Sequence, residues 1–322
     1  MKASYRLIDY SLRPGKFAER KMLCEVFSRL RPFSSLRDYV YVGFGSIWFA
    51  DHVLFHKSLG ISELISIERV SAHAARFEFN RPFANVDVRI GSANQQLTGL
   101  DWGKPLILWL DYDDPLSPSI LDDVRTVATR AESGMLLTVS VQANGFVGAS
   151  DVDDEEREVI RTPRDFRNEF GDERTPGDLN VLDLTGWKVA KTSRVALRQE
   201  IDEALLRRNV SVQEEERLEF HQVAAFEYAD GAKMTTIAGI LVKASETGTY
   251  QACGYDELEY FRDGVDAVRI KVPKLTPKEM RFLDSLLPGL PDEEELAPLP
   301  PADAKHYGRF YRYLPNFASF EP

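Results

Sequence analysis

The chain has 322 residues, of which 43% are hydrophobic and 28% are charged, as is typical of a folded globular protein and not of a disordered one. Its net charge of −11 argues against nucleic acid and anionic membranes as partners, because a surface of that sign repels phosphate groups. The two cysteines, Cys24 and Cys253, give neither a disulfide framework nor metal-ligand spacing. With no signal-peptide core and no apolar run that could span a bilayer, the sequence predicts a cytoplasmic protein.

The N-terminal segment, residues 1–37, is expected to form a helical cap. Apolar residues at helical spacing predict an amphipathic helix over residues 16–31 that leaves Lys16, Arg20 and Lys21 largely off the apolar stripe. Arg13 lies in the preceding loop beside Pro14, which restricts the backbone there. Arg13 and Lys16 are therefore candidates for binding an anionic small molecule, and a solvated basic helix face is the alternative for Arg20 and Lys21.

Short apolar runs then alternate with helical segments. Strands are predicted over 39–42, 63–67, 86–90, 105–110 and 135–141, and helices over 47–59, 71–79 and 118–131. This alternation is typical of an α/β protein whose parallel sheet is covered on both faces. Two further strand-like runs within 219–244 are joined by Asp230-Gly231, a strong hairpin signal. We therefore expect a Rossmann-like, doubly wound and mostly parallel sheet over residues 38–250 that ends in an antiparallel β-hairpin.

Two segments depart from this pattern. An acidic insertion punctuated by proline spans about residues 146–190, and a helix is predicted over 191–208. Residues 251–322 are expected to form an accessory subdomain with a strand over 267–272, a helix over 277–287 and an aromatic tail over 307–320. The tail is expected to pack on the body or on a second subunit, so a homo-oligomer is left open.

The first predicted strand runs into a glycine turn, Gly43-Phe44-Gly45-Ser46. Glycine lets the backbone approach a ligand closely, although a simple packing turn is the alternative. A dinucleotide motif would require a third glycine at position 48, where this chain has Trp48, so nicotinamide and flavin dinucleotides are disfavoured. Glu68 ends the next strand, where a carboxylate accepts hydrogen bonds from both ribose hydroxyls. Together these features predict a nucleoside ligand that lacks a pyrophosphate.

The order of the motifs resembles that of class I S-adenosylmethionine-dependent methyltransferases. The resemblance rests on VYVGFGS, ISIE, VRIGSANQ, LILWLDYDDPL and the hairpin, which follow one another between residues 39 and 243. The stretches LRPGKFAERKMLCE and GFGSIWFADHVLFHKSLGI are also similar to a bacterial family described as O-methyltransferases. The resemblance implies S-adenosylmethionine as the cofactor and methyl transfer to an oxygen atom of an unidentified acceptor.

The same resemblance implies roles for the residues at the strand ends. The glycine turn would line the methionine end of the cofactor, Glu68 would hold the ribose, and the residues after the third strand would lie beside adenine. Asn94 departs from the usual pattern, in which an acidic residue accepts from the adenine amino group, although an amide oxygen could substitute. The complete set implied to bind the cofactor is Gly43, Phe44, Gly45, Ser46, Glu68, Arg69, Ser92, Ala93, Asn94, Asp111 and Tyr112.

Three acidic residues, Asp111, Asp113 and Asp114, follow the fourth predicted strand at the edge where open α/β sheets bind ligands. An aspartate there can take a proton from an attacking hydroxyl, orient it, or hold a cation. Asp111 and Asp113 are the candidate catalytic residues. Asp114, like Ser117, precedes a proline and is interpreted as a helix cap.

His52 and His56 have a spacing that can ligate a metal, but the sequence supplies no further ligands nearby, so no metal site is predicted. Two alternatives to a methyltransferase stay open. One is a non-catalytic module that binds S-adenosylmethionine or another nucleotide without turnover, and the other, less favoured because of Trp48, is a Rossmann oxidoreductase.

Overall fold

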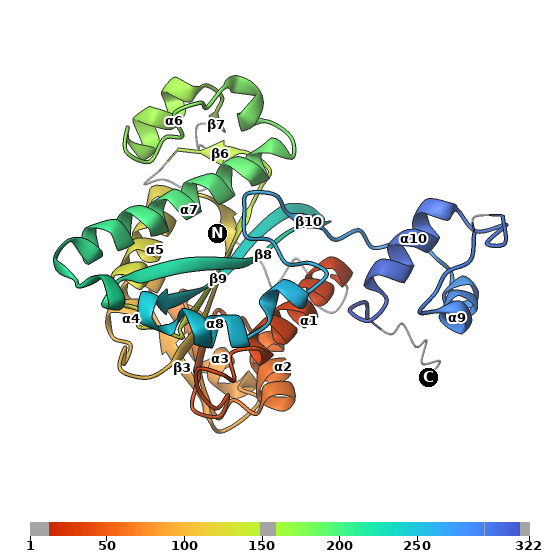
Figure 1. The fold of residues 1–322 in the computed structure, drawn as a ribbon, viewed down its shortest axis with the longest axis horizontal. Coiled ribbons are helices and arrows are strands. Elements are labelled where there is room, and N and C mark those ends of the chain that lie inside the picture. Colours follow the sequence, from red (N-terminus) through yellow and green to blue (C-terminus); the bar gives the residue numbers. More distant parts are fainter. Residues whose placement is uncertain (1–12, 149–158, 293, 316–322) are drawn as a thin grey trace.

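The computed structural model describes residues 13–148, 159–292 and 294–315, and these are organised around one eight-stranded sheet. From one edge to the other the strands are β10 (Val268–Arg269), β8 (Leu218–Asp230), β9 (Ala232–Lys243), β5 (Leu136–Gln142), β4 (Leu106–Pro115), β1 (Val40–Gly43), β2 (Glu63–Glu68) and β3 (Val86–Ile90) (Figure 1).

The strands β1 to β5 run parallel to one another. Strand β9 pairs antiparallel with both β5 and β8, and the β8–β9 hairpin turns at Gly231 with a φ of 98°. The predicted Rossmann-like sheet ending in an antiparallel hairpin is therefore confirmed. The predicted strand over 267–272 is reduced to the two residues of β10, which pair parallel with β8 at the sheet edge.

Helices cover both faces of the sheet (Figure 1). One face carries α4 (Ala93–Thr98), α5 (Pro118–Arg130) and α7 (Lys188–Arg208). The opposite face carries α1 (Pro14–Ser28), α2 (Ala50–Leu59), α3 (Ala74–Asn80) and α8 (Thr247–Ala252). Short 3₁₀ helices span Ser71–His73, Val181–Leu184, Asn209–Ser211, Glu214–Glu216, Ala244–Glu246 and Tyr255–Glu257. None of the described helices is long and apolar enough to cross a membrane.

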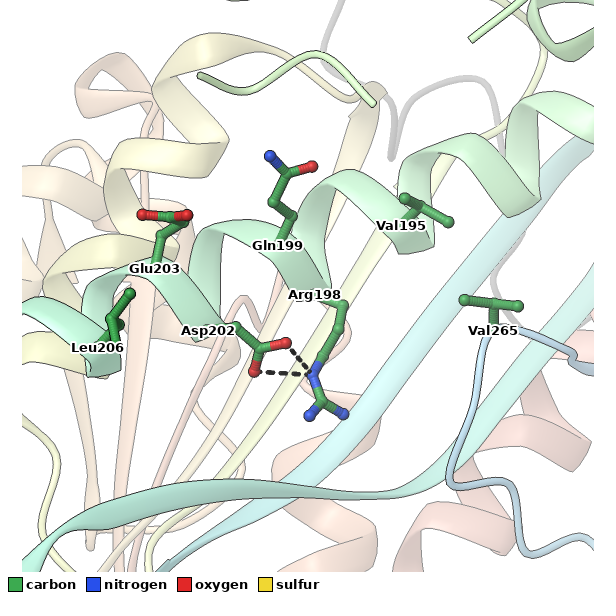
Figure 2. A pocket seen from close by; sticks show the side chains of 7 residues that line it. All are labelled: Val195, Arg198, Gln199, Asp202, Glu203, Leu206 and Val265. Atoms are coloured by element: carbon green, nitrogen blue, oxygen red, sulfur yellow. Dashed lines mark hydrogen bonds and ion pairs between the residues drawn. The ribbon is translucent and has the colours of Figure 1, made fainter. Parts of the chain in front are cut away.

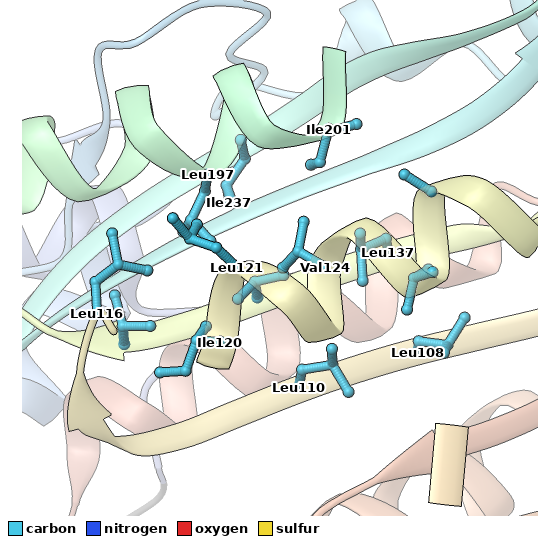
Figure 3. Close-up of a cluster of buried hydrophobic side chains, with 14 of the residues drawn as sticks. Leu108, Leu110, Leu116, Ile120, Leu121, Val124, Leu137, Leu197, Ile201 and Ile237 are labelled. Atoms are coloured by element: carbon cyan, nitrogen blue, oxygen red, sulfur yellow. The ribbon is translucent and has the colours of Figure 1, made fainter. Parts of the chain in front are cut away.

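The sheet separates two apolar cores because side chains alternate along each strand. Leu108 and Leu110 of β4 belong to the core beneath α5 and α7, which Figure 3 shows from close by. Ile107 and Trp109, the neighbours of Leu108 on the same strand, belong to the opposite core beneath α1 and α2. All four side chains are fully buried. The continuous apolar run of β4 thus serves both faces, as expected for a central parallel strand.

Helix α1 is docked by the hairpin. The backbone N–H groups of Gly15 and Lys16 donate to the carboxylate of Asp230, at 3.1 and 2.8 Å. One turn further along, the Thr236 hydroxyl of β9 donates to the Glu19 carboxylate. An acid at a helix N-terminus satisfies free N–H groups and complements the helix dipole. Residues more than two hundred positions away therefore hold the N-terminal helix in place.

The insertion forms a small layer of its own beyond α7 (Figure 1). It contains a separate antiparallel pair, β6 (Phe146–Val147) and β7 (Val159–Ile160), and helix α6 (Pro163–Phe170). Arg174 connects it to the main sheet's helices, because its guanidinium pairs with Asp122 of α5 at 2.5 Å and with Glu200 of α7 at 2.9 Å. The centre of the predicted acidic segment, residues 149–158, lies outside the described residues.

The C-terminal helices α9 (Pro277–Leu286) and α10 (Pro301–Phe310) stand to one side of the sheet (Figure 1). They share a small core of their own, made of Leu283, Leu296, Leu299, Ala304 and Tyr307. The chain then returns to the body, where the Tyr313 hydroxyl donates to Glu25 of α1 at 2.7 Å. Within the described part of the aromatic tail, Phe310 and Tyr313 therefore pack on the body and Tyr307 packs in the small core; residues 316–320 lie outside the described range.

Candidate functional site

The corner after β1 differs from the predicted turn, because α2 begins at Ala50 rather than near residue 47. Residues 46–49 form a turn before the helix, and two of them, Ser46 and Phe49, adopt the left-handed conformation with φ of 49° and 46°. That conformation is uncommon outside glycine and persists only where surrounding contacts hold it. Here Phe49 is fully buried, whereas Trp48 is 50% exposed. The corner is therefore a specifically held backbone turn rather than the direct start of a helix.

Gly45 is required by its neighbours in the protein. Its N–H donates to the Ser66 hydroxyl of β2 at 3.0 Å. A Cβ at this position would lie 2.5 Å from that hydroxyl oxygen and 2.7 Å from the Phe49 ring. Gly43 is similarly constrained, since a Cβ there would lie 2.4 Å from the Tyr41 hydroxyl. Both positions therefore require glycine for packing, which the sequence analysis gave as the alternative to close approach of a ligand. The contact of Gly45 with Ser66 also places the corner against β2.

Gly45→Ala is expected to destabilise the protein by about 1–3 kcal/mol, because the added methyl group overpacks the contact with Ser66 and Phe49. Thermal or urea unfolding measures the change. Gly177→Ala is the matched control, because a Cβ there meets nothing within 4 Å, and it should change the unfolding free energy by less than about 0.5 kcal/mol. Equal stability of the two variants would contradict the close packing of the corner.

Glu68, the last residue of β2, directs its carboxylate at this corner. The Ser66 hydroxyl donates to Glu68 Oε1 at 2.9 Å, and the backbone N–H groups of Gly45 and Ser46 also hydrogen-bond to the carboxylate. The residue is only 7% exposed. Burial raises its pKa to about 7, against the lowering effect of these three hydrogen bonds. The sequence prediction that Glu68 lies beside the glycine turn agrees with this geometry.

The segment after β3 lies at the same edge of the sheet. Ser92 is the N-cap of α4, where its hydroxyl accepts from the Gln95 N–H at 3.3 Å and the Gln95 side chain reciprocates. Ala93 packs against the core and Asn94 is exposed. No helix is predicted at the position of α4, although the Ser92-to-Gln95 spacing is a capping-box signal that identifies one.

A buried acid that was not predicted lies next to this segment. The Tyr112 ring contacts the Phe44 ring edge-on at 5.1 Å, and its hydroxyl donates to Asp123 Oδ2 of α5 at 2.8 Å. Asp123 is 5% exposed. The sequence contained a signal for it, because Asp123 comes three residues after Ile120 on the otherwise apolar stripe of α5. An acid on such a stripe is buried, and a buried acid requires partners.

Asp111 lies at the ligand-binding edge, paired with a buried lysine. Lys16 Nζ is 2.7 Å from Asp111 Oδ1 and 2.9 Å from Glu19 Oε2, and it lies 4.2 Å from the centre of the Trp109 ring. The Asp111 side chain keeps 18% exposure, whereas the Lys16 side chain keeps only 4%. Burial raises the pKa of Asp111 to about 6, while Lys16 lowers it. The pKa of Lys16 is raised, because the two carboxylates outweigh its burial, so the ammonium stays charged.

The solvated helix face, which was the alternative for Arg20 and Lys21, is wrong for Arg20. Lys16 is 3% exposed and Arg20 is 7% exposed, and the Arg20 guanidinium pairs with the buried Asp51 of α2. Only Lys21 is exposed as expected. The physical reason is that carboxylates from other elements pair with the basic groups and offset the cost of burying their charge. Arg13, the other predicted acceptor-binding residue, lies half-buried just before α1.

The remaining acids of the strand end behave differently from Asp111. Asp113 is exposed. The interpretation of Asp114 as a helix cap is wrong, because β4 continues to Pro115 and Ser117 is the N-cap of α5 instead. The Asp114 carboxylate lies 3.9 Å from the Arg69 guanidinium, and both side chains are substantially exposed. Asp111 and Asp113 therefore both lie at the ligand-binding edge, Asp111 half-buried and paired with Lys16 and Asp113 open to solvent.

A family model described as "Putative O-methyltransferase" matches residues 8–322, which is almost the whole chain. The chain belongs to this family. The resemblance noted from the sequence motifs is thereby confirmed at the level of the family. No curated protein matches the chain.

Several solved methyltransferase structures are similar at low identity. Trm1 from Pyrococcus horikoshii with S-adenosylmethionine is 11% identical with a TM-score of 0.45, and the match covers 74% of this chain and 57% of that one. The O-methyltransferase TomG from Streptomyces achromogenes, also with S-adenosylmethionine, is 14% identical with a TM-score of 0.36 and coverages of 72% and 90%. An O-methyltransferase from Bacillus cereus with S-adenosylhomocysteine is 13% identical with a TM-score of 0.34 and coverages of 70% and 81%.

The two histidines of α2 have structural partners in this O-methyltransferase family member. His52 Nε2 hydrogen-bonds to the Ile65 carbonyl at 3.1 Å, and His56 Nδ1 hydrogen-bonds to the Ile61 carbonyl at 2.8 Å. Within residues 13–148, 159–292 and 294–315, no group of three or more His, Cys, Asp or Glu side chains could hold a metal ion. These bonds tie α2 to the strand β2 and to the segment that leads into it.

A hollow of about 450 Å³ lies elsewhere, along α7 and the loop that contains Val265 (Figure 2). On the α7 side of it, the guanidinium of Arg198 pairs with Asp202, one turn further along the helix, at 2.7 Å (Figure 2). None of the residues predicted to bind cofactor or acceptor lines it; its lining is Val195, Arg198, Gln199, Asp202, Glu203, Leu206 and Val265. The candidate site of this family member is therefore distinct from that hollow.

Proposed function

We propose that the protein transfers a methyl group from S-adenosylmethionine to an oxygen atom of a small acceptor. The observation that carries the proposal is the Glu68 carboxylate, which is held against the Gly45–Ser46 corner by hydrogen bonds from that corner and from Ser66. A carboxylate at this place in a Rossmann-like sheet accepts hydrogen bonds from ribose hydroxyls. Membership of an O-methyltransferase family supports the same reaction class.

The residues at the sheet edge fit an adenosyl ligand. Glu68 would accept from the ribose, the backbone of Gly43 to Ser46 would lie along the methionine part, and the aromatic pair Phe44 and Tyr112 would border the nucleoside. S-adenosylmethionine supplies an already activated methyl group, so the protein contributes mainly positioning and removal of a proton. The predicted roles of Arg69, Ser92, Ala93 and Asn94 beside these residues stay part of the proposal.

Asp111 is the residue proposed to receive the proton. With a pKa of about 6 it is ionised at neutral pH, yet it is a stronger base than an ordinary carboxylate. Lys16 is already engaged by Asp111 and Glu19, so we assign it to holding Asp111 rather than to binding the acceptor. Asp113 is the second candidate for the proton-accepting role, and Arg13 remains the candidate for an anionic group on the acceptor.

The wider predictions on partners belong to the same proposal. We propose a small-molecule acceptor, without nucleic acid or a membrane as partner, in keeping with the net charge of −11. A cytoplasmic location and a homo-oligomer are likewise proposed from the sequence alone.

Isothermal titration calorimetry with S-adenosylhomocysteine and with NAD⁺ tests the cofactor assignment. We expect S-adenosylhomocysteine to bind in the micromolar range, at about −8 kcal/mol, and NAD⁺ to give no heat. Binding of NAD⁺ alone would instead favour the oxidoreductase. To distinguish an enzyme from a non-catalytic binding module, label transfer from methyl-labelled S-adenosylmethionine into small-molecule extracts is compared for wild type and Asp111→Asn. An enzyme predicts labelled product that Asp111→Asn loses while it still binds S-adenosylhomocysteine.

A further inference from the structure

We infer that Glu19 of α1 is a positioning residue for methyl transfer, because its carboxylate shares the Lys16 ammonium with Asp111 and so leaves Asp111 basic enough to accept a proton. The inference rests on the proposed function, in which Asp111 receives the proton of the acceptor hydroxyl. Lys16 Nζ lies 2.9 Å from Glu19 Oε2 and 2.7 Å from Asp111 Oδ1. A lysine paired with Asp111 alone would favour the ionised carboxylate more strongly and weaken it as a base.

A chain of hydrogen bonds runs from the centre of the sheet to the Glu19 carboxylate. The Trp109 indole N–H donates to the Ser140 hydroxyl at 2.9 Å, and that hydroxyl lies 2.7 Å from the hydroxyl of Thr236. The Thr236 hydroxyl donates to Glu19 Oε1. All four residues are fully buried, so each of these bonds is costly to lose.

The direction of this chain requires an ionised Glu19. The Trp109 N–H can only donate, so the single hydrogen of the Ser140 hydroxyl points to Thr236, and the hydrogen of Thr236 points to the carboxylate. A proton on Glu19 Oε1 would reverse the last two bonds and leave the Ser140 hydrogen facing the indole, which is not an acceptor. A proton on Oε2 would face the Lys16 ammonium, which also only donates. Glu19 therefore places a negative charge beside Lys16.

Several titratable or charged groups face Asp111. They are Lys16, Glu19 and Arg20 of α1, Tyr41 of β1, Asp51 of α2, Asp113 of β4 and Tyr228 of β8. Burial keeps both tyrosines neutral, because it raises their pKa well above the ordinary value. Arg20 pairs with Asp51, and Asp113 is exposed to solvent. Among these groups, Glu19 is therefore the buried acid that shares a cation with Asp111.

Carbon-13 NMR of protein labelled at the aspartate side-chain carboxyl tests the inference, and the loss of one signal in Asp111→Asn assigns Asp111. The wild-type signal is expected to titrate with a midpoint at about pH 6. Glu19→Gln keeps the size of the side chain and an oxygen that accepts from Thr236, but it removes the charge, so the midpoint should move to lower pH. Glu19→Asp keeps a carboxylate that is one methylene shorter, so it should give a smaller shift in the same direction.

Glu25→Gln is the matched control, because Glu25 lies on the same helix and accepts from Tyr260 and Tyr313, so the Asp111 midpoint should equal that of the wild type. A midpoint in Glu19→Gln that stays at or above the wild-type value would overturn the inference. If Glu19→Gln does not fold, the same outcome in Glu19→Asp would overturn it.

Label transfer into small-molecule extracts measures the consequence for the reaction. Transfer by Glu19→Gln should begin at lower pH than in the wild type and reach a lower maximum, because a weaker base takes the proton less readily. An unchanged pH profile in this variant would overturn the role of Glu19 in methyl transfer. If the wild type transfers no label at any pH, the proposed function fails, whereas the NMR titration still decides whether Glu19 controls the basicity of Asp111.

Discussion

Glu68→Gln is expected to weaken the binding of S-adenosylhomocysteine by roughly a hundredfold, because two ribose hydroxyls each lose a charged acceptor worth about 1.5 kcal/mol. The substitution keeps the size of the side chain and one acceptor oxygen, so the hydrogen bond from Ser66 can persist. Calorimetry at about pH 8, where the wild-type carboxyl is ionised, measures the loss. An unchanged affinity would remove the central support for the proposed function.

Glu63→Gln is the matched control, because Glu63 begins the same strand and its carboxylate pairs with Lys104 at the surface. The Glu63→Gln variant should bind S-adenosylhomocysteine with the same affinity as the wild type. The pH dependence gives a second check. Since the pKa of Glu68 is about 7, wild-type affinity should fall as the pH is lowered through that value, and Glu68→Gln should lack this dependence.

Although Glu68→Gln is expected to bind S-adenosylhomocysteine more weakly, its stability against unfolding should not decrease. The folded-state pKa of Glu68 lies above its ordinary value, so this carboxyl favours folding at low pH, and that contribution is lost as the pH rises through about 7. A neutral glutamine does not carry the buried charge at higher pH. Thermal unfolding at about pH 8 should therefore show a variant at least as stable as the wild type.

Lys16→Met is expected to destabilise the protein by about 3–5 kcal/mol near pH 8, because it leaves the carboxylates of Asp111 and Glu19 buried without their shared cation. Methionine keeps the length of the side chain, so the loss reports charge rather than volume. Urea unfolding measures the difference. Lys21→Met is the control on the same helix, because Lys21 is exposed, and it should cost less than about 0.5 kcal/mol.

The pH dependence of Lys16→Met identifies the cause. Lys16 lowers the pKa of Asp111, so its removal raises that pKa above about 6 in the folded protein. A carboxyl whose folded pKa exceeds its unfolded pKa contributes stability at low pH that is lost as the pH rises. The difference in unfolding free energy between Lys16→Met and the wild type should therefore become smaller as the pH is lowered to about 5.5. A gap that stays constant would indicate lost packing instead.

The sheet and its ligand-binding edge could be predicted because their signals are local. Apolar runs bounded by turns identify parallel strands, and Asp230-Gly231 identifies the hairpin. The proximity of Glu68 to the glycine corner follows from geometry alone, since adjacent parallel strands end at the same edge. These inferences require no knowledge of which side chains meet across the fold.

The buried ionic pairs could not be predicted, because each depends on partners far away in the sequence. Lys16 and Asp111 are 95 positions apart, and periodicity alone assigns a lysine to the solvent side of a helix. The apolar stripe of α5 indicates that Asp123 is buried, but its partner Tyr112 belongs to a different element and could not be predicted. Helix α10, which is not among the predicted helices, begins at Pro301 directly after a proline-rich segment, and prolines there indicate a loop.

The docking of α1 on Asp230 and Thr236 has a consequence for how the chain folds during synthesis. Residues 14–28 leave the ribosome well before Asp230 and Thr236, whose carboxylate and hydroxyl hold them in place. Contacts of such large separation in sequence form late, since loop closure precedes them. Lys16, the cation that pairs with Asp111, therefore reaches its place only when the hairpin is complete, so a nascent or truncated chain that lacks residues 218–243 leaves Asp111 without this partner.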